Sequence, residues 1–270
     1  MRFHSSHPQR DPSHRLVRVL DVDPDLGAAL SPERRAEAAE RLVARCVGAR
    51  AGTVADTALS AAGPGGLGLL VLDGVLAREI LLSDNVSVEL LGAGDLIQAS
   101  APDDPGRLLR SAIRWTVVEP ARLAILDSRF AAELTEYPEV TSMLFSRLVE
   151  RSHRLGVALA IAQLNGVDRR ALALFWHLAE RWGHMSAAGV ELPLRLPHRI
   201  IAQMVGARRP TISSALTTLA ADGKVTRRPD GGWILHGEPV GVPHQDVCRV
   251  IPLRRRRVSA GEPVGTSPVA

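Results

Sequence analysis

The stretch that decides the fold is residues 192–236, LPLRLPHRIIAQMVGARRPTISSALTTLAADGKVTRRPDGGWILH. Its apolar residues recur at helical spacing in two short segments separated by Gly206-Ala207. The apolar positions are Ile200, Ile201, Met204 and Val205 in the first segment, and Ile212, Ala215, Leu216 and Leu219 in the second. The second helix is expected to end at Asp222-Gly223, because glycine suits the left-handed cap. The sequence therefore predicts two helices joined by a tight turn.

A β-hairpin is expected directly after these helices. Residues 224–228 and 232–235 can pair across Pro229-Asp230-Gly231, three residues typical of a turn. Two helices, a tight turn and a following hairpin make a winged helix-turn-helix.

The second helix predicts a DNA-contacting surface. With its apolar stripe buried, it exposes polar residues, and its first turn is the part that enters the major groove. An arginine there can bond bidentately to guanine, hydroxyls suit phosphates or base edges, and arginines on the wing reach flanking phosphates. The predicted contact residues are Arg208, Arg209, Pro210, Thr211, Ser213, Ser214, Thr217, Arg227 and Arg228. The alternative is a helix pair used only for packing.

The charge distribution agrees with such a surface. Residues 192–257 carry a net charge of +8, which leaves −4 for the rest of a chain of formal charge +4. A basic end on a mildly acidic body is the electrostatic footprint of a nucleic-acid-binding module. The alternative is a solvated basic surface without a partner.

The N-terminal half has the texture of a small antiparallel barrel. A helix is expected from Pro32 to about Val47, and short apolar runs broken by Gly, Pro and Asp follow up to Leu126. Asp73-Gly74, between two apolar runs, predicts a tight hairpin turn. The expected strands are 67–72, 75–82, 87–91, 115–118 and 121–126.

A long helix is expected from Asp127 to Asn165. Along it, Leu144, Leu148, Arg151, Leu155 and Ala162 follow steps of three and four that are typical of a dimer coiled coil. A helix packed on its own domain gives the same pattern. Asn165-Gly166 then breaks the helix, and Asp168 is expected to cap the next one, Arg169 to Gly183.

Several classes of protein are disfavoured by the sequence. No apolar run reaches the length of a membrane span, and the polar N-terminus lacks the apolar stretch of a signal peptide, so a cytoplasmic protein is expected. Cys46 and Cys248 alone make neither a disulfide framework nor a metal site. No nucleophile elbow or Walker-type glycine loop occurs, and we predict neither catalytic residues nor a metal.

Between about residues 30 and 237 the chain resembles the cyclic-AMP receptor/fumarate-nitrate regulator (Crp/Fnr) transcription factors. IIAQMVGARRPTISSALTTLAADGKVTRR looks like the family's helix-turn-helix, and GLLVLDGVLAREI with SVELLGAGDLI is similar to its sensor barrel. The resemblance aligns the family's base-reading arginine with Arg209. The glutamate that follows it in the family is Pro210 here, and a second arginine is Ser214. These departures imply an operator unlike the family's best-known half-site.

The resemblance also bears on an effector. In the family, a Gly-Glu pair that holds the ribose follows the Gly-Asp turn, but here Gln98-Ala99 follows Gly94-Asp95. Arg110-Ser111 resembles the Arg-Ser pair that binds the cyclic phosphate, and makes these two residues the candidate effector site. The intervening stretch, which contains Asp103 and Asp104, would repel an anion. Cyclic-nucleotide binding is therefore disfavoured, and no cofactor is predicted.

Together these patterns predict an α+β protein with a cyclic-nucleotide-binding-like β-barrel, a long dimerisation helix and a C-terminal winged helix-turn-helix. The expected parts are a flexible arm (1–28), the barrel (29–126), the dimerisation helix (127–165), the DNA-binding domain (166–237) and a flexible basic tail (238–270). The predicted function is that of a non-enzymatic transcription regulator. Double-stranded DNA and a second copy of the chain are its expected partners, RNA polymerase is a further candidate, and no membrane is expected. The competing hypothesis is an enzyme or small-molecule-binding protein with a vestigial helix-turn-helix. The sequence leaves open whether the Arg254–Arg257 run contacts DNA.

Overall fold

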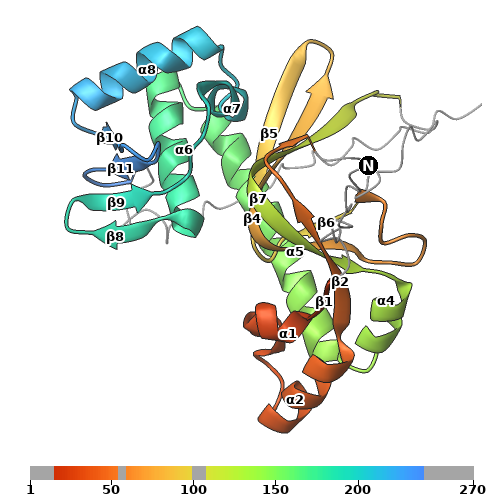
Figure 1. The fold of residues 1–270 in the computed structure, drawn as a ribbon. Coiled ribbons are helices and arrows are strands. Elements are labelled where there is room, and N and C mark those ends of the chain that lie inside the picture. Colours follow the sequence, from red (N-terminus) through yellow and green to blue (C-terminus); the bar gives the residue numbers. More distant parts are fainter. Residues whose placement is uncertain (1–14, 54–58, 99–107, 240–270) are drawn as a thin grey trace, which may run out of the picture. The chain divides into compact units, whose positions relative to one another are not determined.

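The computed structural model describes residues 15–53, 59–98 and 108–239 (Figure 1). Its N-terminal part is an antiparallel sheet of seven strands in which five follow the order β1-β2-β7-β4-β5, with β3 paired to β7 and β6 paired to β4. The strands are β1 (Arg15–Arg18), β2 (Val43–Ala49), β3 (Gly52–Thr53), β4 (Gly68–Leu82), β5 (Asn85–Leu91), β6 (Leu96–Ile97) and β7 (Ala112–Leu126). The cyclic-nucleotide-binding-like sheet domain expected from the sequence is therefore present.

The expected hairpin at Asp73-Gly74 is wrong, because β4 runs straight through it. The register of β4 against β7 shifts on both sides of Asp73, which is a β-bulge. Asp73 Oδ1 accepts the backbone N–H of Arg122 at 2.9 Å, and a Cβ on Gly74 (φ 84°) would lie 2.3 Å from the carbonyl oxygen of Pro120. Gly74, which has no side chain and a positive φ, thus forms part of a bulge opposite Pro120 rather than a turn.

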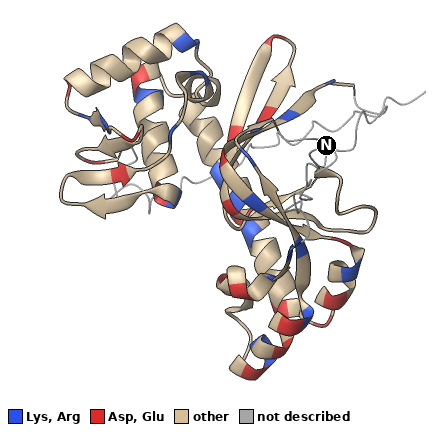
Figure 2. Ribbon diagram, viewed as in Figure 1, with Lys and Arg blue, Asp and Glu red and all other residues tan. Residues whose placement is uncertain are grey.

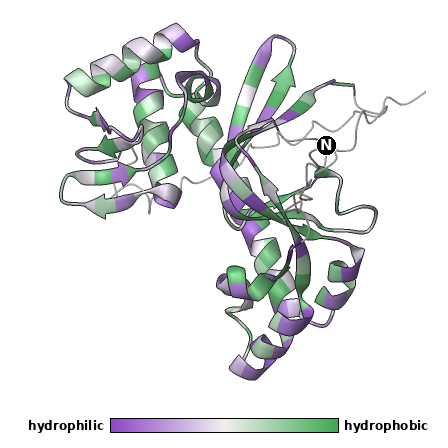
Figure 3. Cartoon of the chain, viewed as in Figure 1, coloured by the Kyte–Doolittle hydropathy of each residue, from purple (hydrophilic) through white to green (hydrophobic). Residues whose placement is uncertain are grey.

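The N-terminal segment is more ordered than expected. Residues 15–27 form β1, helix α1 (Val19–Val22) and the 3₁₀ helix η1 (Pro24–Gly27), so the predicted flexible arm does not extend over them. Leu20 and Leu26 are both about 2% exposed or less and belong to the core of the sheet domain. The predicted helix 32–47 also ends early, because α2 (Pro32–Arg41) stops before β2. In Figure 3, α2 is largely hydrophilic. Residues 1–14 lie outside the described residues.

The predicted single helix 127–165 is two helices, α4 (Ser128–Leu134) and α5 (Pro138–Ala162). Asp127 Oδ1 accepts the Phe130 N–H at 3.1 Å and caps α4. Pro138 starts α5, where its missing N–H leaves no helical hydrogen bond unmade. The long helix is therefore 25 residues long and begins eleven residues later than the predicted start at Asp127.

The C-terminal part has the predicted winged helix-turn-helix, with two strands that the sequence analysis missed. Its helices are α6 (Val167–Trp182), α7 (His198–Met204) and α8 (Arg209–Ala221). Its strands form a four-stranded sheet in the order β10-β11-β9-β8: β8 (His184–Ser186), β9 (Gly189–Leu192), β10 (Val225–Arg227) and β11 (Trp233–Leu235). The expected cap at Asp168 is wrong, because α6 is preceded by Gly166 at φ 86° with no capping side chain.

Within the described ranges, no helix combines the length and the apolar composition that crossing a membrane requires.

Candidate nucleic-acid interface

Helix α8 is held by the apolar stripe that the sequence predicts. Ile212, Leu216 and Leu219 are buried, and α8 packs on both α6 and α7. Because this stripe faces inward, the opposite side of the helix is left to solvent. The exposed residues of the predicted contact set are Arg208, Arg209, Pro210, Thr211, Ser214, Thr217 and Arg227, while Ser213 and Arg228 are half-buried.

The exposed side of α8 is suited to a polyanion. The helix contains no acidic residue, and Figure 2 shows its one basic residue at one end. That residue is Arg209, the first of the helix, directly after Arg208. The positive end of the helix dipole adds to these two charges. The first turn of α8 therefore has the electrostatics that a phosphate or a guanine edge requires.

The hydroxyls on α8 are already engaged with the helix backbone. Ser213 Oγ donates to the Arg209 carbonyl at 3.1 Å, and Thr217 Oγ1 donates to the Ser213 carbonyl at 3.0 Å. Ser214 makes the same bond to Pro210 at 3.3 Å. A hydroxyl carries one hydrogen but two lone pairs, so in this arrangement these oxygens are free to accept rather than to donate. They suit amino groups of bases, and must rotate to reach phosphate oxygens.

His198, at the start of α7, is a member of this surface that the sequence analysis missed. Its Nδ1 lies 2.9 Å from Ser213 Oγ. Because the single hydroxyl hydrogen of Ser213 goes to Arg209, the imidazole N–H is the donor. Burial lowers the pKa of His198, and the nearby charges of Arg227 and Arg209 lower it further. Its position directly after Pro197 at a helix start is the only sequence signal that marks it.

The two wing arginines have different surroundings. The Arg227 guanidinium lies 4.4 Å from the centroid of the Trp233 ring, a cation–π contact, and the residue is exposed. Arg228 instead forms ion pairs with Glu191 on β9 and, at 3.0 Å, with Asp230. Arg227 is therefore available to a phosphate, whereas Arg228 is engaged in holding the wing to β9.

The predicted dimer seam is only partly on the surface of α5. Leu148 and Leu155 are exposed, and Ala162 is half-buried. Leu144, in contrast, is 7% exposed and packs in the core of its own sheet domain. Arg151 donates to both carboxylate oxygens of Glu89, at 2.6 and 2.8 Å. Leu144 and Arg151 therefore point to the chain's own sheet.

The apolar residues that α5 leaves exposed follow the same heptad spacing as the predicted seam, but some of them lie one residue further along the helix. We call the α5 strip the exposed set Phe145, Leu148, Leu155 and Leu159 together with Val149. Positions 145, 148, 152, 155, 159 and 162 continue in alternating steps of three and four. The strip thus keeps Leu148 and Leu155 of the prediction, and its period also reaches Ala162. In place of Leu144 it has the next residue, Phe145.

The candidate effector residues Arg110 and Ser111 are both exposed, just before β7. Asp103 and Asp104, which the prediction invoked beside them, lie outside the described residues, as does the Arg254–Arg257 run. In the described part of the chain, no group of three or more His, Cys, Asp or Glu side chains is placed to hold a metal ion.

A sheet domain, a long helix and a four-stranded winged helix-turn-helix define a two-domain winged-helix protein. Residues 169–238 match the model of the Crp-like helix-turn-helix domain. The C-terminal part therefore contains a Crp-like helix-turn-helix domain, as the sequence resemblance to the Crp/Fnr family implied.

Known relatives extend this comparison. The chain is 27% identical over 146 residues to the CRP-like cAMP-activated global transcriptional regulator of Mycobacterium tuberculosis, an alignment that covers 54% of this chain and 62% of that protein. The fold is similar to that of FixK2 from Bradyrhizobium japonicum (TM-score 0.55, 14% identity, 72% of this chain and 93% of that one). It is also similar to a cyclic nucleotide-binding domain containing protein from Listeria monocytogenes (TM-score 0.55, 16% identity, 79% of this chain and 96% of that one).

Proposed function

We propose that this protein is a sequence-specific DNA-binding transcription regulator of the Crp/Fnr type. It acts in the cytoplasm as a homodimer on an inverted-repeat operator, and its DNA binding does not depend on cyclic AMP. The observation that carries the proposal is the exposed side of α8, which is free of acidic residues and begins with Arg209. The Mycobacterium tuberculosis relative, a transcriptional regulator by name, supports the same function.

Base recognition is assigned to the first turn of α8. Arg209 is exposed at the helix start, where a guanidinium can bond bidentately to a guanine in the major groove. The hydroxyls of Ser213, Ser214 and Thr217 lie one and two turns further along and can accept from base amino groups. Arg227 on the wing reaches a flanking phosphate, which adds affinity without sequence information.

Dimerisation is assigned to the α5 strip. Large exposed apolar side chains at heptad spacing lose contact with water when two such helices pack together. Pairing two copies about a two-fold axis also places two copies of α8 one DNA turn apart, which matches an inverted repeat. A single recognition helix makes too few contacts for strong specific binding.

Independence from cyclic AMP is proposed from the residues after the turn at Gly94-Asp95. Gln98 stands close to where the family's Gly-Glu pair holds the ribose, and a buried hydroxyl without a partner costs about 1–3 kcal/mol. In isothermal titration calorimetry we expect millimolar affinity at best for cyclic AMP and cyclic GMP. Micromolar binding that is lost in Arg110→Ala would overturn this part of the proposal and make the sheet domain a cyclic-nucleotide sensor.

The experiment that tests the function is selection of genomic DNA by the purified protein. Sheared genomic fragments are bound, washed at rising salt and sequenced. We expect enrichment of fragments that share an inverted repeat with half-sites one DNA turn apart. Retention of random fragments only, or of none, would refute the proposal and favour the competing hypothesis of a small-molecule-binding protein or enzyme with a vestigial helix-turn-helix.

A further inference from the structure

Two carboxylates are buried in the sheet domain, and each is shared by two arginines. In the part of the chain that the structure describes, Glu79 and Asp95 are the only buried charged residues, at 0% and 3% exposure. A buried carboxylate is stable only when it is paired and hydrogen-bonded. The elements that supply the arginines paired with each carboxylate therefore indicate which parts of the chain are held in contact.

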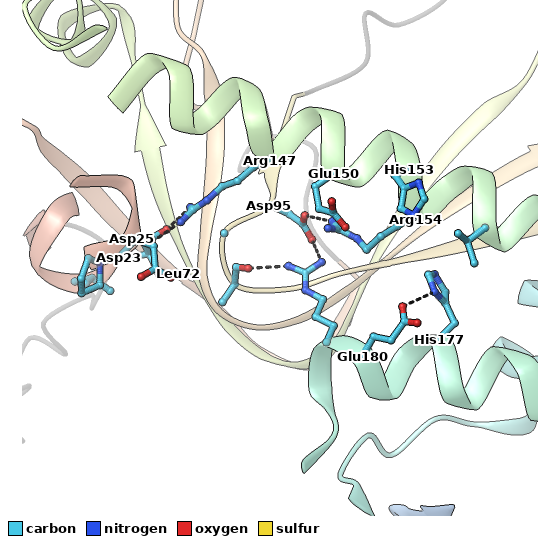
Figure 4. A pocket seen from close by; sticks show the side chains of 16 residues that line it. Asp23, Asp25, Leu72, Asp95, Arg147, Glu150, His153, Arg154, His177 and Glu180 are labelled. Carbon is cyan, nitrogen blue, oxygen red and sulfur yellow. Dashed lines mark hydrogen bonds and ion pairs between the residues drawn. The ribbon is translucent and has the colours of Figure 1, made fainter. Parts of the chain in front are cut away.

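Asp95 closes the turn between β5 and β6. Its Oδ2 accepts the backbone N–H of Gly92 at 2.9 Å, which folds the carboxylate over the turn. Arg154 on α5 donates to Oδ1 at 2.7 Å, and Figure 4 shows this pair. Arg181, in the last turn of α6, donates to Oδ2 at 2.6 Å and also to the Ala93 carbonyl at 2.7 Å. One carboxylate thus connects the turn, the long helix and the first helix of the winged-helix domain.

Glu79, on β4, is paired in the same way. Arg114 on the neighbouring strand β7 donates through Nε to Oε2 at 2.6 Å, and Thr116 Oγ1 lies 3.4 Å from Oε1. The other oxygen also receives Arg199 of α7, with Nη2 3.4 Å from Oε1. Glu79 is therefore shared between a strand of its own sheet and the helix on which α8 packs.

The two clusters have one arrangement in common. Each carboxylate has one arginine from its own part of the chain, Arg154 or Arg114, and one from the winged-helix domain, Arg181 or Arg199. Losing the second arginine leaves the carboxylate still paired, so the sheet domain can stay folded without the winged-helix domain's contribution. The second arginine is needed only to keep the two domains together.

Shape complementarity supports one of the two contacts. A Cβ on Gly92 would lie 3.1 Å from the indole of Trp182, the residue after Arg181, so the turn and the end of α6 are in close contact. The Asp95 cluster also lies on the wall of a cavity of about 600 Å³, lined among others by Arg147, Glu150 and Arg154 (Figure 4). Because Arg181 borders this cavity, replacing it by a shorter polar residue leaves no sealed void.

We infer that Arg181 and Arg199 are positioning residues that hold the winged-helix domain in one orientation on the sheet domain. Two attachment points, one on α6 and one on α7, restrict rotation as well as translation of the domain. In the dimer, this fixes the direction in which each copy of α8 is presented, so that two half-sites can be bound without further ordering. This role rests on the proposed DNA-binding function, whereas the attachment itself does not.

The test compares two double variants that remove equal numbers of guanidinium groups from the same carboxylates. Arg181→Gln with Arg199→Gln removes both contacts between the domains. The matched control, Arg154→Gln with Arg114→Gln, removes the partners within the sheet domain and long helix and keeps the interdomain ones. Circular dichroism and the melting temperature check that both variants are folded.

The first readout is the distance between the domains. Spin labels are attached through Glu40→Cys on α2 and Thr218→Cys on α8, in protein that also carries Cys248→Ser. The labelled protein is diluted with unlabelled chain, and the distance between the two labels is measured by double electron–electron resonance. Glu40 and Thr218 are both exposed, and Cys46 is buried. We expect a narrow distribution in wild type and control and a clearly broader one in Arg181→Gln/Arg199→Gln. Equal widths in the two double variants would overturn the inference.

The second readout is DNA binding. On the inverted-repeat fragment selected by the wild-type protein, we expect Arg181→Gln/Arg199→Gln to bind about tenfold or more weakly, because preorganisation of two linked sites is lost. Binding to random DNA of the same length should be unchanged, and the control should match wild type on both. Equal operator affinity in all three proteins would overturn the role in DNA binding. If the wild-type protein binds no DNA, the proposed function fails, while the distance measurement still decides whether the two arginines position the domain.

Discussion

Protonation of His198 should destabilise the folded protein, because it puts a positive charge on a half-buried imidazole near Arg227 and Arg209. The imidazole is half-buried, and its Nδ1 donates to Ser213 Oγ at 2.9 Å. Removing this hydrogen bond in His198→Ala should lower the free energy of unfolding by about 0.5–1.5 kcal/mol. For a domain of 60–100 residues, each kcal/mol shifts the melting temperature by about 4–8 °C. We therefore expect a loss of several degrees at pH 7.5.

The pH dependence has a definite sign. Burial, with Arg227 and Arg209 nearby, lowers the pKa of His198 in the folded protein below its ordinary value of about 6.5. Between these two pKa values the unfolded chain binds a proton that the folded chain does not, so stability falls as the pH is lowered through about 6.5. Wild-type protein should lose stability over this window.

The variant His198→Asn separates the contribution of the hydrogen bond from that of protonation. An asparagine amide can donate the same hydrogen bond to Ser213 but does not titrate. Its melting temperature at pH 7.5 should lie near that of wild type, and it should fall less steeply between pH 7.5 and 5.5, as measured by differential scanning calorimetry. All other residues are the same in both proteins, so their contributions cancel in the comparison. An identical slope in wild type and His198→Asn would refute the reasoning.

Three further predictions concern the proposed function. Arg209→Ala should cost about 1–3 kcal/mol at the selected operator and relax the base preference there, measured by fluorescence anisotropy on operator variants; equal weakening on random DNA would argue against base recognition. Arg227→Ala should weaken specific and random DNA alike and flatten the salt dependence, whereas Arg228→Ala, which removes an ion pair of the wing, should mainly lower the melting temperature; the opposite result would exchange their roles. Leu148→Asp should give monomers in sedimentation velocity, while Leu82→Asp, an equally exposed leucine on β4, should leave the dimer intact; a dimeric Leu148→Asp protein would place the interface elsewhere.

The α5 helix shows how far a periodic pattern can be interpreted. The steps between Leu144, Leu148 and Leu155 fit a helix with one apolar face, and a helix is present. Yet a 25-residue helix can be apolar on two sides, and only contact with the sheet reveals that Leu144 belongs to the inner side. Arg151 is drawn inward by Glu89, a residue 62 positions earlier that no helical period includes.

The hairpin turn predicted at Asp73-Gly74 was also wrong because of contacts with a distant strand. The dipeptide favours a positive φ, and Gly74 has one, at 84°. A positive φ is compatible with a β-bulge as well as with a hairpin turn. Here the facing strand contains Pro120, which cannot donate a ladder hydrogen bond, and β4 forms a bulge. Local sequence thus determined the backbone conformation of Gly74 but not the structure built around it.

The sequence by itself determined the helices and the wing hairpin of the winged helix-turn-helix, but not β8 and β9. Its helices bury a stripe at 3.6-residue spacing against each other, and its turns need glycine at Gly206 and Gly223, both at positive φ. These are short-range requirements that a single segment displays. The arginines at positions 181, 199 and 228 carry no such signal, because an arginine on a helix or strand looks the same whether it faces water or a carboxylate. Only the tertiary structure could decide their partners, since Asp95, Glu79 and Glu191 reach them through packing of elements that are distant in the sequence.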